Sequence, residues 1–253
     1  MSTPLIVGNW KMNTSLDEAI TLAKAAAAVA DGAGAGTDVG ICPPFTWIVP
    51  VRDAVRGSSL RVGAQDCSAH DNGAYTGDIS AKMLASCCTF TLVGHSERRS
   101  VHGETDDLLQ QKLHEALEAG LDVILCVGES AEERNTGIAD RVVLRQIDAT
   151  LDRTRLTDTS RLTIAYEPVW AIGTGVAATE ADASQMATLI REDLDARFGS
   201  SADHIRVLYG GSANDRNAPA FLAAKNVDGL LVGSASLSAD VFASLIEGAR
   251  ITP

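Results

Sequence analysis

Eight short apolar runs, separated by longer segments with helical signals, constrain the fold of this chain more than any other feature. Each run is rich in Val, Ile and Leu and is followed by small or polar residues, which is typical of a buried strand. The runs begin at Leu5, Asp38, Leu60, Phe90, Leu121, Leu162, Ile205 and Asp228. The pattern therefore predicts eight β-strands that alternate with helices.

The segments between the runs carry signals for helix ends. Ser15 precedes a helical apolar pattern and Glu18 follows three residues later, which is the spacing of a capping box. A second helical segment starts at Ala178 and closes at Gly199. Strands joined through helices run parallel, because a tight turn cannot reach a parallel neighbour.

Eight such units favour a closed (β/α)8 barrel of eight parallel strands. The 253 residues are close to the roughly 250 of a typical barrel. The alternative is a doubly wound open sheet, but the G-x-G-x-x-G that usually follows its first strand is missing. Residues 31–38 are interpreted as a flexible loop, and no Pro/Ser-rich linker divides the chain. We expect one catalytic barrel domain over residues 1–253.

Composition and charge exclude several classes of protein. With 45% hydrophobic and 21% charged residues, the chain has the composition of a soluble globular protein. The net charge of −12 would repel nucleic acid and anionic membranes. The N-terminal residues lack a signal peptide, and no apolar run approaches the roughly 18 residues of a membrane span. Neither export nor membrane insertion is expected.

The cysteines indicate a reducing compartment. Their number is odd, they form no C-x-x-C motif, and most lie in apolar runs, so we interpret them as reduced core thiols of a cytoplasmic protein. They are Cys42, Cys67, Cys87, Cys88 and Cys126. No spacing of His, Cys and carboxylate residues resembles a metal site, and we expect neither a metal nor a cofactor.

Polar residues gather where the predicted strands end. In a parallel barrel these ends share one face, which is where barrel enzymes form their active sites. The residues are Asn9, Lys11, Gln65, His95, Glu97, Glu129, Glu167, the turn 210–212, Gly233 and Ser234. A catalytic site is therefore expected on this face.

Glu167 and His95 are the strongest catalytic candidates. Glu167 stands beside Pro168 and Trp170 in apolar sequence, and a partly desolvated carboxylate is a better base than a solvated one. His95 precedes Ser96, the expected N-cap of a helix whose positive end would keep the imidazole neutral. The alternatives are a solvated strand-end carboxylate and a structural histidine. The other four histidines are interpreted as structural.

Lys11 and three glycine-rich turns indicate an anionic substrate. An acidic protein needs a local cation to hold an anion, although Lys11 could be an ordinary surface lysine. The turns span residues 172–175, 209–212 and 231–234, and the last two follow the seventh and eighth runs, where barrels commonly bind phosphate. Together these residues fit proton abstraction beside the carbonyl of a small phosphorylated sugar.

At these residues the chain resembles the triosephosphate isomerase family over essentially its full length. The motifs GNWKMN, CPPF, GAQD, GHSERR, LCVGES, AYEPVWAIGTG and YGGS occur in the family's order. The resemblance implies a TIM barrel that interconverts dihydroxyacetone phosphate and glyceraldehyde 3-phosphate through an enediolate, in glycolysis and gluconeogenesis, without cofactor or metal. A glutamate base paired with a neutral histidine is the established pattern of this enzyme.

The resemblance also assigns roles to individual residues. Glu167 is the implied base, His95 the electrophile and Lys11 the electrostatic anchor. Asn9 and Glu97 are supporting polar groups, and Gly173, Ser212, Gly233 and Ser234 match phosphate-binding positions. Residues 168–178 match a lid that closes over the substrate. The family is usually a homodimer, with the loop 69–78 inserted into the partner and Thr76 near the partner's Asn9.

Some positions depart from the family pattern. Asp66 stands where Asn is frequent, Asp78 where Glu is frequent, and Ser234 where Gly is usual. Residues 176–178 replace a more polar lid hinge. Cys87 occupies the place of a helix-ending Gly and is expected to cost some local stability. For Ser234 we expect an ordinary φ, because the residues after it can start a short helix.

Three other functions remain compatible with the residues. A tetrose-phosphate isomerase would need the same base and phosphate site. An aldolase could form a Schiff base on Lys11. A binding protein without catalysis is the third, and the presence of Glu167, His95 and Lys11 together argues against it.

Overall fold

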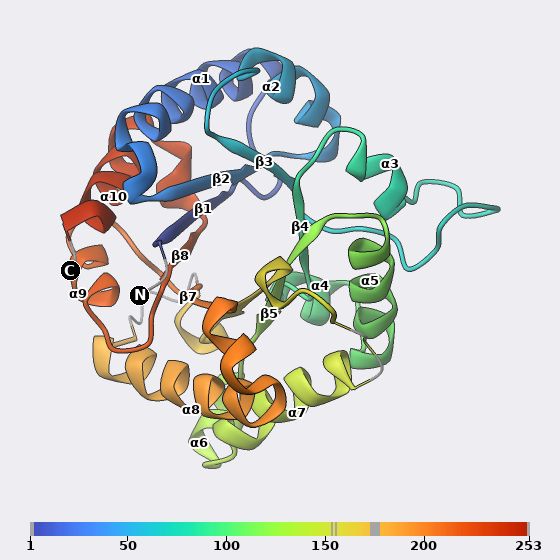
Figure 1. Cartoon of the computed structure of the whole chain (residues 1–253), viewed down its shortest axis with the longest axis vertical. Helices are drawn as coiled ribbons and strands as arrows, with labels where there is room; N and C mark the ends of the chain where they lie inside the picture. The colour runs from blue at the N-terminus through green and yellow to red at the C-terminus, as the bar shows by residue number, and fades with distance from the viewer. Residues whose placement is uncertain (1–2, 153, 155, 173–177, 252–253) are drawn as a thin grey trace.

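The fold is a closed barrel. The computed structural model describes residues 3–152, 154, 156–172 and 178–251. Within them, eight parallel strands pair in sequence order and β1 pairs with β8, which confirms the barrel and excludes an open sheet (Figure 1). The strands are β1 (Leu5–Asn9), β2 (Asp38–Cys42), β3 (Arg61–Ala64), β4 (Phe90–Val93), β5 (Asp122–Val127), β6 (Leu162–Tyr166), β7 (Arg206–Tyr209) and β8 (Gly229–Val232).

Helices surround the barrel (Figure 1). They are α1 (Leu16–Ala33), α2 (Ile48–Ala54), α3 (Ala81–Ala85), α4 (Ser96–Val101), α5 (Asp106–Glu118), α6 (Ala131–Asn135), α7 (Ala139–Leu151), α8 (Glu180–Phe198), α9 (Ala218–Leu222) and α10 (Ala239–Ile251). The predicted capping box of Ser15 and Glu18 is present, and α8 ends at Gly199 as predicted.

The prediction of a flexible loop at residues 31–38 is wrong. The alanine-rich pattern of α1 continues to Ala33, which is buried, and the 3-10 helix η1 (Gly34–Gly36) leads directly to β2. Gly34 ends the helix as its C-cap with φ 60°, so the glycines mark a helix end rather than a flexible loop.

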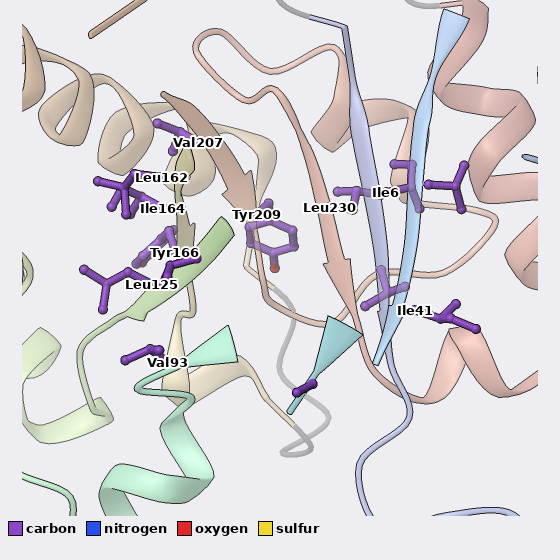
Figure 2. Packing of buried hydrophobic residues seen from close by; sticks show 14 of the residues in the cluster. Ile6, Ile41, Val93, Leu125, Leu162, Ile164, Tyr166, Val207, Tyr209 and Leu230 are labelled. Atoms are coloured by element: carbon purple, nitrogen blue, oxygen red, sulfur yellow. The ribbon is translucent and has the colours of Figure 1, made fainter. Parts of the chain in front are cut away.

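The strands divide the core into two layers. Successive side chains of a strand point to opposite faces, so every second one enters the barrel. Outward side chains such as Ile6, Ile41 and Leu230 pack under the helices (Figure 2). Inward side chains form a separate cluster of Leu5, Val7, Cys42, Phe90, Leu92, Ile124, Cys126, Ala165, Leu208 and Leu231. The barrel is therefore a filled scaffold, and its polar strand ends lie over a rigid floor.

Phe90 occupies the interior of the barrel beside two glycines. A Cβ atom on Gly63 would lie 2.5 Å from the Phe90 ring, and one on Gly40 would lie 2.9 Å from it. Real Cβ contacts are not this short, so the two glycines provide the space that the ring fills.

All five cysteines lie within the described residues and are free. Cys42, Cys67, Cys88 and Cys126 are buried as predicted, while Cys87 is half-buried. Burial raises the pKa of Cys42 and of Cys126 well above the ordinary thiol value. Cys87 is not among the described residues with positive φ, so the expected cost of replacing a glycine there does not arise. In the described part of the chain, no helix is both long and apolar enough to span a membrane.

Candidate active site

The predicted site residues line one cavity of about 700 Å³ at the carboxyl ends of the strands. It is lined by every residue with an implied role that the structure describes, namely Asn9, Lys11, His95, Glu97, Glu167, Ser212, Gly233 and Ser234. Gln65 and Glu129, also expected at strand ends, are not part of its lining. Residues 173–177, which include Gly173 and Val176 of the expected lid, lie outside the described residues. The structure thus brings the sequence candidates from five strand ends together.

Glu167 follows β6 and its carboxylate is held inside the protein. Only 2% of the residue is exposed. Its Oε2 accepts a hydrogen bond from the backbone N–H of Ser96 at 2.7 Å, and its Oε1 lies 3.1 Å from Nε2 of His95. In this position the carboxylate is desolvated, as predicted, and it is held at the end of β4, two strands away.

His95 acts as the N-cap of α4, where Ser96 had been expected. Its Nδ1 accepts a hydrogen bond from the backbone N–H of Glu97 at 3.2 Å. An Nδ1 that accepts carries no proton, so the neutral ring carries its proton on Nε2. The Ser96 prediction was wrong because His95 supplies the acceptor itself, which leaves the Ser96 N–H to bind Glu167. With Nδ1 as the acceptor, Nε2 is the ring nitrogen that can donate a hydrogen bond.

Lys11 points to the same cavity from the residues after β1. Its Nζ forms a 2.6 Å ion pair with Oε1 of Glu97. Burial acts to raise the pKa of Glu97, but the hydrogen bond and charge of Lys11 outweigh it and lower that pKa overall. The backbone of Lys11 has φ 52°, a left-handed conformation that costs a non-glycine residue roughly 1–3 kcal/mol.

Neighbouring side chains hold this strained backbone in place. Asn9 Oδ1 accepts from the Lys11 N–H at 3.0 Å, and Gln65 Nε2 donates to the Lys11 carbonyl at 2.8 Å. Strain that the surroundings maintain is common where a side chain must be placed accurately. Asn9 and Gln65 therefore position the cation.

The far side of the cavity is formed by backbone. Gly233 precedes the 3-10 helix η6 (Ser234–Leu237), which starts at Ser234 itself. Ser234 is not among the described residues with positive φ, so the expected ordinary φ is confirmed. The Ser212 hydroxyl donates to the Ala171 carbonyl at 2.8 Å, beside the lid. The start of η6 thus lies at the cavity, where the sequence predicted a phosphate site.

Glu129 contacts the 3-10 helix η4 (Val169–Ala171), which lies where the first hinge of the lid was expected. This carboxylate is fully buried, and its Oε1 accepts from Trp170 Nε1 at 2.7 Å and from the Tyr166 hydroxyl at 3.1 Å. Arg134 pairs with Glu129 at 3.2 Å and lies over the Trp170 ring at 4.4 Å. The sequence placed Glu129 at a strand end but did not indicate this role.

A second charged group lies beside the site and is called here the interior ion cluster: Asp66, Arg98, Glu104 and Lys112. Lys112 Nζ lies 2.8 Å from Asp66 and 2.6 Å from Glu104. Arg98 Nε lies 2.8 Å from Asp66 and 2.6 Å from Glu104. Two cations thus balance two carboxylates, and the Asp66 that replaces the family's frequent Asn supplies one of them. Asp78 has a local partner, since it accepts from the Ser68 hydroxyl at 2.6 Å.

Comparison with known proteins identifies the family. The family model described as Triosephosphate isomerase matches residues 4–249. The chain belongs to the triosephosphate isomerase family. Triosephosphate isomerase of Afipia carboxidovorans is 47% identical over 96% of this chain and 96% of that protein. The enzyme of Hahella chejuensis is 44% identical over 98% of this chain and 99% of that protein.

A solved structure of the family is also similar. The crystal structure of triosephosphate isomerase from Bartonella henselae matches with a TM-score of 0.89 and 36% identity, over 98% of this chain and 100% of that one. The predicted fold, family and class of enzyme, an isomerase, are confirmed by these matches. Among the described residues, no group of three or more His, Cys, Asp or Glu could hold a metal ion.

Proposed function

We propose that the chain interconverts dihydroxyacetone phosphate and glyceraldehyde 3-phosphate, as one catalytic domain over residues 1–253. The observation that carries this proposal is the single cavity that holds a buried carboxylate, a neutral histidine, a lysine and the start of a helix. Proton transfer beside a carbonyl requires a base and a way to stabilise the oxygen that becomes negative. Glu167 supplies the first, and His95 and Lys11 supply the second.

The proton moves in two steps. The Glu167 carboxylate removes a proton from the substrate carbon beside the carbonyl, and the electron pair passes to the carbonyl oxygen. The Nε2–H of His95 and the ammonium group of Lys11 stabilise this enediolate. The Nε2–H of His95 gives its proton to the former carbonyl oxygen, and the same nitrogen takes the proton of the neighbouring hydroxyl, which becomes the new carbonyl. Glu167 then returns the carbon-bound proton to the former carbonyl carbon. Because the carboxylate is held by the Ser96 N–H at 2.7 Å, it must leave that contact to reach the substrate.

The substrate phosphate binds at the start of η6, with Gly233, Ser234, Ser212 and Gly173 as its proposed contacts. Closure of the lid 168–178 excludes water and keeps the enediolate from losing phosphate. Glu129 holds the first hinge through Trp170.

A coupled assay for triose phosphate interconversion tests the proposal. We expect turnover without added metal in the presence of a chelator. An inactive, folded enzyme would contradict the proposal. The same assay with a tetrose phosphate separates the two isomerase activities, and we expect the three-carbon substrate to react faster.

The ion pair of Lys11 argues against the aldolase alternative. A Schiff base forms on an unprotonated amine. The Lys11 nitrogen is instead engaged in a 2.6 Å ion pair with Glu97. Borohydride added with substrate should therefore leave the enzyme active, and inactivation with reduction at Lys11 would favour the aldolase.

The active form is proposed to be a homodimer in which the loop 69–78 enters the partner and Thr76 approaches the partner's site near Asn9. Figure 1 shows the segment between β3 and α3 projecting from the barrel, and Thr76 is exposed. Apolar side chains are exposed at Met12 (95%), Val101 (74%) and Met83 (58%). We propose that these side chains contact the partner, because burial of exposed apolar surface favours association.

The oligomeric state tests the dimer directly. Thr76→Glu places a charge in the proposed interface, and we expect monomers with little activity in sedimentation and in the coupled assay. An active wild-type monomer would contradict the dimer.

The free cysteines support a reducing compartment, and we propose that the enzyme works in the cytoplasm.

A further inference from the structure

Ser236 lies beneath the proposed phosphate contacts but does not reach the cavity. It belongs to η6, and its exposed fraction is 0%. Gly233 and Ser234 line the cavity, whereas Ser236 is not part of its lining. A buried hydroxyl must be hydrogen-bonded to avoid a large desolvation cost, so its partner indicates its role.

That partner is the carbonyl of Gly233. The backbone N–H of Ser236 donates to this oxygen at 2.9 Å and its hydroxyl donates to the same oxygen at 2.6 Å. In a trans peptide the carbonyl and the N–H of the next residue point in opposite directions. Ser236 holds the Gly233 oxygen, so the Ser234 N–H of that peptide points away from Ser236 and to the cavity side.

Gly8 of β1 supplies the space that Ser236 occupies. A Cβ atom on Gly8 would lie 2.7 Å from Cβ of Ser236, 3.0 Å from its Oγ and 3.3 Å from Cζ of Phe242. Phe242 is buried in the core and cannot move away without disturbing close packing. A side chain at position 8 would therefore displace Ser236 and, with it, the peptide between Gly233 and Ser234.

We propose that Ser236 and Gly8 are positioning residues for the substrate phosphate: Ser236 orients the Ser234 N–H through the Gly233 carbonyl, and Gly8 sets the position of Ser236. The inference rests on the proposed function, because it assumes that phosphate binds at the start of η6. Neither residue touches the reacting atoms. Their loss should weaken phosphate binding and leave the chemical step nearly intact.

The first test is Ser236→Ala, which keeps Cβ and the backbone N–H but removes the hydroxyl. We expect KM and the inhibition constant of inorganic phosphate to rise together, roughly three- to tenfold, as for one lost hydrogen bond. The value of kcat should change less than about twofold, because the Glu167 and His95 contacts are untouched. Ser244→Ala is the matched control, since the Ser244 hydroxyl donates to the Asp240 carbonyl on exposed α10. It should leave both constants unchanged.

The second test is a double-mutant cycle of Gly8→Ala with Ser236→Gly. In the wild type, the added methyl group meets Ser236, so Gly8→Ala should weaken phosphate binding by at least as much as Ser236→Ala. In the Ser236→Gly background the nearest contact is gone, and the same change should have a much smaller effect. If Gly8→Ala does not fold, the Ser236→Ala result decides.

Three results would overturn the inference. They are an unchanged phosphate inhibition constant in Ser236→Ala, a loss confined to kcat, and equal effects of Gly8→Ala in both backgrounds. A wild-type enzyme that fails the coupled assay, or that inorganic phosphate does not inhibit, would instead contradict the proposed function.

Discussion

Two groups of charged side chains share helix α4, and they are arranged in opposite ways. The group proposed to be catalytic places Glu167 against His95 and a backbone N–H, and it borders a large cavity. In the interior ion cluster, each carboxylate meets two cations within 2.8 Å. Glu97 of α4 faces the first group, and Arg98 of the same helix belongs to the second.

This difference indicates which group is suited to react with a ligand and which group stabilises the fold. A buried carboxylate without a cation among its contacts is costly, and such a cost is kept where the group must react. A balanced cluster avoids most of that cost and has no charge left to act on a ligand. On this basis, changes in the cluster should affect stability, and changes at the cavity should affect activity.

The largest effect is expected from Lys112→Met in the interior ion cluster. It removes a cation from two buried carboxylates at once, and breaking a buried ion pair costs about 3–5 kcal/mol of folding free energy. Urea denaturation should show this loss. Activity per folded molecule should stay near the wild-type value. A large fall in kcat without a loss of stability would show that the interior ion cluster takes part in catalysis.

Glu167→Asp should have the next largest effect, and it should fall on activity. The shorter side chain withdraws the carboxylate by about one bond length, and a displacement of that order can cost roughly a hundredfold in rate. The fold should be kept. Steady-state kinetics should show kcat falling more than KM changes, and a kcat within about threefold of wild type would mean that Glu167 is not the base.

Ser234→Pro tests the backbone side of the cavity. Proline removes the N–H donor, and loss of a charge-assisted hydrogen bond should weaken binding by about 1–3 kcal/mol, roughly 5- to 150-fold. The inhibition constant of a phosphorylated enediolate mimic measures this loss. Ser234→Gly keeps the N–H and is the control, with a change of less than about threefold expected. A large loss in the glycine variant would show that the hydroxyl itself binds phosphate.

The smallest effect is expected from Asp66→Asn. The amide oxygen can still accept from Lys112, so stability at neutral pH should change by about 1 kcal/mol or less. Burial raises the pKa of Asp66 above its ordinary value of 3.8, although Lys112 acts in the opposite direction. The folded protein therefore binds this proton more tightly than the unfolded chain does.

The sign of the pH dependence follows from that shift. The contribution of Asp66 protonation to stability is fully present below 3.8 and is lost as pH rises through the raised pKa. Asp66→Asn removes this term, so the wild type should gain stability relative to the variant as the solution is acidified. Denaturation midpoints of both proteins, measured from neutral pH down to below pH 3.8, give this difference in stability. If the wild type became less stable relative to the variant in acid, the pKa of Asp66 would not be raised in the folded protein.

The fold and the cavity could be predicted because their signals are local. Each strand is a continuous apolar run, and strand ends in a parallel barrel meet on one face, so Glu167, His95 and Lys11 could be brought together from separate motifs.

Contacts between distant residues could not be predicted. Asp66 and Lys112 are 46 residues apart, and nothing in either local sequence indicates the ion pair. Gly8 and Ser236 belong to opposite ends of the chain and meet only when the barrel closes. The capping role of His95 was missed for a different reason, because serine is the more common cap and the imidazole acceptor depends on a tautomer that the sequence does not reveal.

The packing of Phe90 against Gly40 and Gly63 has a consequence for how this sequence can diverge. A methyl group at position 63 would overlap the ring at 2.5 Å, so Gly63→Ala is tolerable only after Phe90 has become smaller. A smaller residue at position 90 alone leaves a void in a close-packed interior. Each single step is thus unfavourable while the paired change is not. The three positions should be inherited as a unit, and homologues that vary one of them should vary another.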